Sequence, residues 1–339
     1  MVDLRSDTVT RPSPAMRQAM VDAEVGDDVF GEDPTVLLLQ EHVADLLGKK
    51  AALYVPSGSM ANQLAIRIHT QPGDEVICEA NCHIVNYESA ASPVLSGVQL
   101  LPLPGTRGRL SPDQVSAAIR HGYYWEPKSR LVCLENTANK AGGTVLDQDE
   151  VVAVGDAVRA KGLAFHLDGA RIWNAAVANG LSVRQLAAPF DTVSVCLSKG
   201  LGAPIGSLIA GPTELIQKAH RWRKLFGGGM RQVGILAAAG LHALEHHRQD
   251  LPDDHARARR FADGLAAFGA VTIDPESVET NIVMFDVSGM TALETVERMK
   301  ESGVLVVPFG PQRIRATTHR DLSDADIDVA LAAAARVLS

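Results

Sequence analysis

Short apolar runs alternate with amphipathic stretches through the first two thirds of the chain. The apolar runs have the length of buried strands and lie at Ala51–Val55, Glu75–Cys78, Gln99–Leu103, Leu131–Leu134, Leu163–Leu167, Thr192–Cys196 and Ser207–Ala210. Stretches between several of them carry apolar residues at helical spacing, as in Met60–His69, Ser111–Arg120 and Glu150–Lys161. Strands that alternate with helices form βαβ units. The pattern predicts an α/β fold with a mainly parallel central sheet flanked by helices, whose ligands bind beyond the carboxyl ends of the strands.

The pattern changes after a long helical stretch at Val233–His247. A polar break containing Pro252 is expected at Gln249–Asp254. Beyond it the chain predicts helices and strands in a different arrangement, at His255–Phe268, Asn281–Val287, Val304–Pro308, Arg313–Thr317 and Ser323–Leu338. We therefore expect a large domain at residues 1–248, which includes an N-terminal active-site segment, and a smaller C-terminal α+β domain at 249–339.

Composition excludes several classes of partner. The 339 residues include 40 acidic and 32 basic ones, so the formal net charge is −8. An acidic chain repels the phosphate backbones of nucleic acids, so we expect no nucleic-acid partner. No uncharged apolar run approaches the ~20 residues of a membrane-spanning helix, and we expect neither a signal segment nor an anchor at the start. The cysteines form no CxxC pair, which is typical of reduced thiols in a cytoplasmic protein; they are Cys78, Cys82, Cys133 and Cys196.

Two predicted strands end in residues that carry chemistry. Asp168 and Arg171 follow one of them, and Lys199 follows the next, between small residues. A desolvated lysine becomes a nucleophile for carbonyl groups. Lysine and an upstream aspartate are what pyridoxal 5'-phosphate (PLP) requires, because the lysine forms the Schiff base and the aspartate keeps the pyridine nitrogen protonated. The small-residue turn within Tyr54–Asn62, at the start of a helix, offers a cup for the phosphate.

Each of these motifs also has an ordinary structural explanation. The aspartate and arginine are typical of a turn with a surface ion pair, the lysine segment of a loop, and the serine-rich turn of a helix cap. Their order along the chain and their positions at the ends of strands together favour a PLP enzyme.

The sequence resembles a known family, the low-specificity L-threonine aldolases. These are PLP enzymes of fold type I (aspartate-aminotransferase-like). The matching segments span nearly the whole chain and are Leu4–Pro12, Val25–Gly31, His166–Arg171, Cys196–Gly202, Arg221–Lys224, Gly227–Gln232 and Arg315–His319. The resemblance implies a lyase that cleaves L-threonine, L-allo-threonine and related β-hydroxy-α-amino acids to glycine and an aldehyde by retro-aldol cleavage. It also implies a homotetramer, a dimer of dimers with shared active sites.

The resemblance further implies roles for individual residues. Lys199 would form the Schiff base, Asp168 would pair with the pyridine nitrogen, and His83 would stack on the ring and relay a proton. The phosphate would be held by Gly58 and Ser59, with Arg231 reaching in from a neighbouring subunit. A flexible loop is the alternative for the segment that carries this arginine.

The resemblance also implies a clamp for the substrate carboxylate, because a guanidinium donates two parallel hydrogen bonds to a carboxylate. Its members would be Ser6, Arg171 and Arg315, and Arg171 would contact the cofactor as well. The alternative for each arginine is a structural salt bridge, above all for Arg171.

One segment departs from the family pattern. Where the family has Glu-Asn-Thr-His-Asn, this chain has Ala138 in place of the histidine that contacts the substrate hydroxyl, and Phe30 stands where tyrosine is frequent. Two consequences are open: His83 carries the proton transfer, or the enzyme prefers a bulkier β-hydroxy amino acid such as phenylserine. We hypothesise a relaxed or shifted substrate range.

Other functions stay open at this stage. The same scaffold supports β-elimination, transamination or racemisation, and a catalytically inactive relative could serve as a binding protein. We expect no metal site. The acidic cluster of Asp27, Asp28, Glu32 and Asp33 lacks calcium-loop spacing, and the His242–His246 pair lacks a third ligand, so a solvated loop and a polar helix face are the preferred interpretations.

Overall fold

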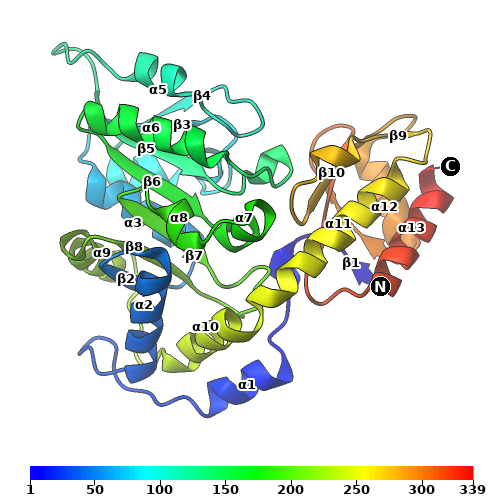
Figure 1. Ribbon diagram of the computed structural model, residues 1–339, viewed down its shortest axis with the longest axis horizontal. Coiled ribbons are helices and arrows are strands. Elements are labelled where there is room, and N and C mark those ends of the chain that lie inside the picture. The colour runs from blue at the N-terminus through cyan, green and yellow to red at the C-terminus, as the bar shows by residue number, and fades with distance from the viewer. Residues whose placement is uncertain (339) are drawn as a thin grey trace.

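The computed structural model describes residues 1–338 and consists of a large α/β part beside a smaller α+β part (Figure 1). The large part contains a seven-stranded sheet, whose strands are β2 (Ala51–Val55), β3 (Asp74–Glu79), β4 (Gln99–Leu103), β5 (Lys128–Glu135), β6 (Ala164–Gly169), β7 (Thr192–Cys196) and β8 (Ser207–Gly211). Their spatial order is β2-β8-β7-β6-β5-β3-β4. All neighbours are parallel except β8, which is antiparallel to both β2 and β7. The predicted fold class, a mainly parallel sheet flanked by helices, is confirmed.

Helices cover both faces of this sheet because the strands are apolar on both sides. In β2, Ala52 and Tyr54 face one core cluster, whereas Leu53 and Val55 face another. The first face is covered mainly by α2 (Pro34–Leu47), α6 (Gln148–Ala160), α7 (Ile172–Asn179), α8 (Val183–Ala187) and α10 (Gly234–His246). The other face is covered by α3 (Gly58–His69) and α9 (Thr213–Leu225). On the same face as the first group, α1 (Pro14–Val21) packs against α10 and α5 (Pro112–Ala118) packs against α6. The short helix α4 (His83–Asn86) follows β3.

The smaller part has an antiparallel sheet of order β12-β13-β10-β9. Its elements are α11 (Leu251–Leu265), β9 (Val271–Thr272), β10 (Ile282–Val287), α12 (Ala292–Glu301), β11 (Val304–Leu305), β12 (Val307–Pro308), β13 (Arg313–Thr317) and α13 (Asp324–Leu338). The N-terminal strand β1 (Val2–Asp3) pairs in parallel with β11, beside the C-terminal helix (Figure 1). Val2 and Leu4 accordingly belong to the core of the smaller part. The domain boundary near residue 249 stays a prediction.

Two sequence predictions for this region are wrong. The run at 304–308 forms two short strands rather than one, and they pair with different partners. The expected polar break is shorter than predicted, because Arg248–Asp250 form a 3-10 turn and α11 already begins at Leu251, with Pro252 in its first turn, where a missing N–H costs nothing. Among the helices of residues 1–338, none combines the length and the apolar character that crossing a bilayer requires.

Candidate active site

A cavity of about 510 Å³ lies beyond the carboxyl ends of β6 and β7, against β12 and β13 of the smaller part. It is lined by Ser6, Thr8, His83, Tyr87, Asn139, Lys140, Arg171, Lys199, Val307, Pro308, Phe309 and Arg315. Five of the predicted site residues therefore meet in one place although they are spread over the whole chain. The lining contains four cationic side chains and no carboxylate.

Arg171 makes a buried ion pair with Asp7. Its Nε and Nη2 donate to the two carboxylate oxygens at 2.7 and 2.8 Å, and both side chains are almost completely buried. Burial alone would raise the pKa of Asp7, but the charge of Arg171 and its hydrogen bond outweigh this, so the pKa of Asp7 falls to about 2. The salt-bridge alternative for Arg171 is thus realised, while its guanidinium still lines the cavity.

Arg315 approaches the same cavity from β13. Its Nη1 donates to Asn139 Oδ1 at 3.0 Å, its Nη2 donates to the Arg5 carbonyl at 3.0 Å, and it stacks on Phe309 at 5.0 Å. No carboxylate pairs with it among residues 1–338. Burial and the neighbouring charge of Arg171 lower its pKa. Two guanidiniums that repel each other at one cavity favour an anion between them.

His83 begins α4, and its imidazole is held by a buried carboxylate. Nδ1 donates to Glu88 Oε1 at 2.7 Å, and the Glu88 side chain is fully buried. Burial opposes the charged imidazolium, but the hydrogen bond that the ring donates to Glu88 and the charge of Asp168 outweigh it, so the pKa of His83 is raised. The other ring nitrogen, Nε2, has no protein hydrogen bond within residues 1–338.

Asn62 of α3 connects this pair to Asp168. Its Nδ2 donates to Asp168 Oδ2 at 2.7 Å and to Glu88 Oε1 at 2.9 Å, and its Oδ1 accepts from Ser194 Oγ at 2.7 Å. Ligand atoms of His83, Glu88 and Asp168 all lie within 4.8 Å of one another, a closeness that these hydrogen bonds explain. Asp168 itself does not line the cavity but lies directly behind His83.

The N-terminus of α3 lies against the strand that leads to Lys199. Ser57 caps this helix by accepting from Met60 N, and a Cβ atom at Gly58 would come within 2.8 Å of Cys196 Sγ. Only glycine permits so close an approach here. The Lys199 backbone is fixed in turn, because its carbonyl accepts from Thr10 Oγ1 and Gly202 N. Gly58 and Ser59 are partly exposed and do not line the cavity itself.

Arg231 lies apart from this group. Its side chain is 62% exposed and pairs at 3.6 Å with Asp27, so this chain does not bring it to its own cavity. The acidic cluster has structural roles: Asp28 pairs with the buried Arg223, and Asp33 caps α2. The rings of His242 and His246 lie 4.5 Å apart.

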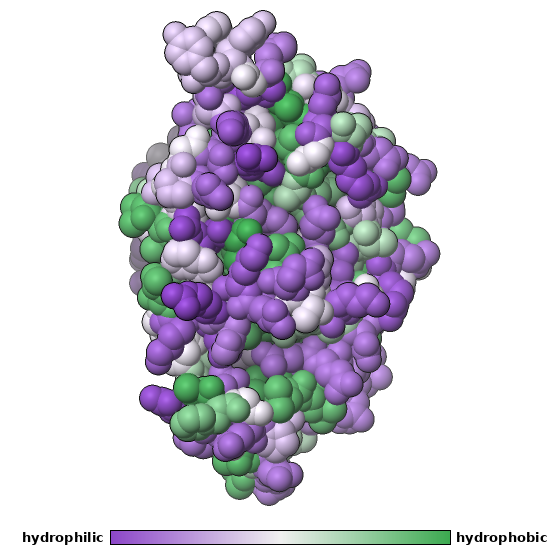
Figure 2. All heavy atoms as spheres, turned by 90° about the vertical axis from the view of Figure 1, so that its left-hand side faces the viewer, coloured by the Kyte–Doolittle hydropathy of each residue, from purple (hydrophilic) through white to green (hydrophobic). Residues whose placement is uncertain are grey.

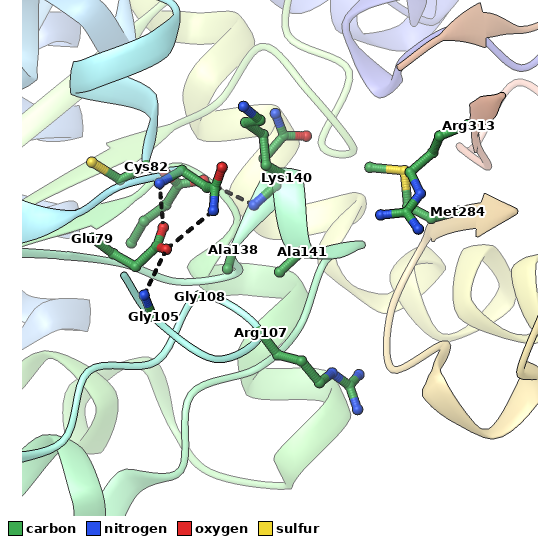
Figure 3. A pocket seen from close by; sticks show the side chains of 13 residues that line it. Glu79, Cys82, Gly105, Arg107, Gly108, Ala138, Lys140, Ala141, Met284 and Arg313 are labelled. Atoms are coloured by element: carbon green, nitrogen blue, oxygen red, sulfur yellow. Dashed lines mark hydrogen bonds between the residues drawn. The ribbon is translucent and has the colours of Figure 1, made fainter. Parts of the chain in front are cut away.

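Ala138 does not face this cavity. It lines a neighbouring hollow instead, where its Cβ lies against Gly108 (Figure 3). Glu135, at the end of β5, accepts from the backbone N–H groups of His83 at 2.6 Å and Asn139 at 2.9 Å. Burial and the nearby Asp168 raise the pKa of Glu135 to about 7.

Sequence reasoning missed Asn62, Glu88, Glu135 and Asp7. Asp7 stands inside the matching segment Leu4–Pro12, next to Ser6, and Asn62 ends the stretch that was predicted to hold the phosphate. Nothing in their spacing shows which side chain they contact, because those partners come from other elements.

Comparisons with known proteins identify the family of this chain. The family model described as β-eliminating lyase matches residues 3–288. The low-specificity L-threonine aldolase 1 of Arabidopsis thaliana is 42% identical over 97% of this chain and 94% of its own. The low specificity L-threonine aldolase of Escherichia coli strain K12 is 42% identical over 95% of each chain. The threonine aldolase structure from Leishmania major superposes with a TM-score of 0.85 at 17% identity and covers 100% of both chains, a likeness of fold.

Proposed function

The chain belongs to the β-eliminating lyase family and, within it, to the low-specificity L-threonine aldolases, and from this premise we propose that it uses PLP to cleave L-threonine, L-allo-threonine and related β-hydroxy-α-amino acids. The products are glycine and an aldehyde. The observation that carries the proposal is the cavity that gathers Lys199, His83, Arg171 and Arg315 at one sheet edge.

The residues present fit PLP. Lys199 would hold the cofactor covalently, the buried carboxylate of Asp168 would face its ring nitrogen, and the α3 N-terminus at Gly58 and Ser59 would receive its phosphate. The close approach of Gly58 to Cys196 supports this, because it sets the phosphate cup beside the strand that delivers Lys199. When bound, PLP supplies an electron sink for negative charge at the substrate Cα.

The cationic lining selects and orients the substrate. Arg315 has no carboxylate partner among the described residues, and Arg171 keeps one nitrogen, Nη1, outside its ion pair with Asp7. An amino-acid carboxylate bound between them, with Ser6 as a further donor, would fix the direction of the scissile Cα–Cβ bond.

In this proposal His83 exchanges the proton of the β-hydroxyl. Glu88 accepts the hydrogen bond of Nδ1–H, and Nε2 has no hydrogen-bond partner among the described residues. A neutral imidazole held in this tautomer accepts a proton at Nε2. The raised pKa of His83 keeps that proton on the ring more readily at neutral pH.

The proposal includes a homotetramer with shared active sites and a cytoplasmic location. Buried free cysteines support a reducing compartment. One face of the molecule is mostly hydrophilic, with apolar side chains gathered near its lower end (Figure 2). Exposed apolar residues occur in and around α2 and α9, namely Val29, Phe30, Leu37, Leu38 and Leu225, and a second copy of the chain would bury them.

The proposal is tested by measuring glycine and aldehyde release from L-threonine, L-allo-threonine, L-phenylserine and L-serine, each with and without added PLP. We expect cleavage of both threonine isomers, dependence on PLP, and complete loss in Lys199→Ala. Pyruvate from serine without glycine from threonine would replace the aldolase by a β-eliminating lyase. A protein that neither binds PLP nor releases product would remove the enzymatic function altogether.

A further inference from the structure

A second hollow, of about 250 Å³, lies between the large part and the smaller part of the molecule (Figure 3). It lies beyond the carboxyl ends of β3, β4 and β5, and Met284 and Arg313 face it from the smaller part. In the sheet these strands follow β7 and β6, which carry the substrate cavity. The two spaces therefore occupy successive positions along one ligand-binding edge.

The two spaces share part of their wall. Asn139 and Lys140 line both the substrate cavity and the hollow. A group attached to the substrate Cβ would therefore reach the hollow past this segment. The position of Asn139 is fixed, because Glu135 binds its backbone and Arg315 binds its side chain.

The floor of the hollow is made of small residues. Gly105, Gly108, Ala138 and Ala141 line it, and a Cβ at Gly108 would come within 2.3 Å of the Ala138 Cβ. The absence of larger side chains at these four positions keeps the hollow open. A cavity of roughly 150 Å³ is enough to hold benzene, so this one has room for an aryl ring with a polar substituent.

The carboxylates around the hollow are already satisfied. Glu79 accepts from the backbone of Asn81 at 2.6 Å and of Gly105 at 3.2 Å. Glu135 accepts from two backbone N–H groups.

Two of its three cations are paired as well. Arg107 pairs with Glu279 at 2.8 Å, and Arg313 pairs with Asp286 at 2.6 Å. Lys140 is the exception, because its Nζ reaches only the amide oxygen of Asn86, at 3.1 Å. The half-buried ammonium of Lys140 is thus the cation at the shared wall that lacks a carboxylate among residues 1–338.

We propose that this hollow is a subsite for the β-substituent of the substrate, and that it favours substituents that end in an anionic group, which Lys140 binds. The inference rests on the proposed aldolase function and adds a substrate class to it: β-hydroxy-α-amino acids with an aryl-sized, anionic side chain. Specificity of this kind arises because a pocket of matching size and charge binds the larger group more tightly.

The test compares three substrates of the PLP-loaded enzyme: L-threonine, phenylserine and phenylserine with a carboxylate at the para position. We expect the wild type to have a higher kcat/KM for the carboxylated compound than for phenylserine. Lys140→Met should lower the ratio of these two values about tenfold, and Lys140→Arg should restore most of it. The ratio cancels any effect of the substitution that both aryl substrates share.

A second variant tests the volume rather than the charge. Ala141→Leu fills the hollow and should lower kcat/KM for both aryl substrates at least tenfold relative to threonine. Ala332→Leu, on the exposed face of α13, is the matched control and should change no ratio. If threonine is cleaved but neither ratio responds, the subsite is overturned while the aldolase function stands. If no substrate yields glycine, the function itself fails.

Discussion

Asn62 is the side chain that joins the two buried carboxylates of the site. Its amide nitrogen donates to both Asp168 and Glu88, while Ser194 holds its oxygen. His166 lies 3.3 Å from the same oxygen, and burial lowers its pKa to about 4, so it is neutral at pH 7. One amide thus fixes Asp168, the carboxylate that we propose for the cofactor ring, and, through Glu88, the orientation of His83.

Removing the charge of Glu88 should change the titration of His83. Glu88→Gln keeps the size of the side chain, and the Gln63 amide, whose Oε1 has no partner, can turn to accept from it. Without the carboxylate the pKa of His83 falls, so we expect the corresponding limb of the kcat/KM–pH profile to move to lower pH and kcat to fall roughly tenfold.

A matched control for this variant exists on the surface. Glu245 lies 3.6 Å from His246, and both side chains are largely exposed. Glu245→Gln should leave the pH profile unchanged. An unchanged profile in Glu88→Gln as well would mean that His83 does not titrate in the reaction.

Side chains next to recognisable motifs were predictable, but their partners were not. Lys199 and Arg315 could be proposed from their segments, and both line the cavity. The Arg171–Asp7 pair joins residues 164 positions apart, and no local pattern reports such a contact. The orientation of Ala138 was equally hidden, because it depends on the packing of its turn against Gly108.

At the scale of elements, Asp33 connects two helices. It is fully buried, caps α2 through Val36 N at 3.0 Å, and also accepts from Gly234 N, the first residue of α10, at 2.7 Å. Asp33→Ala removes the acceptor at both helix starts, and each lost cap costs about 1 kcal/mol. We expect a loss of about 2 kcal/mol in the free energy of unfolding, measured by chemical denaturation.

Asp147→Ala serves as the comparison for this prediction. Asp147 caps only α6, through the N–H groups of Asp149 and Glu150 at the surface. It should cost about half as much. Equal losses in the two variants would contradict the double role of Asp33.

Elements with a clear apolar run were predictable to within three residues, as the strands of the large sheet illustrate. The direction of β8 was not predicted, because an apolar run carries no sign of direction. The ten-residue link between β7 and β8 does favour the antiparallel arrangement, since a parallel crossover needs a dozen or more residues. Helix α9 has a strongly polar surface and buries only Ile216, Ala219 and Arg223, so no apolar pattern indicated it.

At the scale of the whole molecule, α11 carries a buried carboxyl group near the junction of the two parts. Asp254 is fully buried, neither oxygen has a hydrogen-bond partner, and Arg257 lies 3.8 Å away. Burial raises its pKa from 3.8 to about 8, with Asp7 and Asp250 contributing and Arg257 and Arg320 opposing. Between about pH 4 and 8 the folded protein thus holds a proton that the unfolded chain has lost.

This excess proton makes stability fall as pH rises through that window, by up to about 1.4 kcal/mol per pH unit. Asp254→Asn removes the titration, so we expect a flatter stability–pH curve and higher stability at pH 8, measured by denaturant unfolding from pH 5 to 8. Asp253→Asn changes an exposed neighbour on the same helix and should leave the slope as it is. If the free energy of unfolding of Asp254→Asn still falls with pH as in the wild type, another group causes the slope.

The proposed sharing of active sites between subunits can be tested by mixing two inactive variants. Lys199 lines the cavity of its own chain, whereas Arg231 is exposed and does not line that cavity.

If Arg231 completes a neighbour's site, Lys199→Ala and Arg231→Ala are each inactive, but a mixed dimer contains one site with neither substitution. Random mixing makes half of the dimers mixed, so unfolding and refolding the two variants together should restore about a quarter of wild-type activity. Refolding each variant alone controls for the procedure. If Lys199 and Arg231 of one chain served the same site, each of the two sites of a mixed dimer would carry one substitution. The mixture would then stay as inactive as its parents.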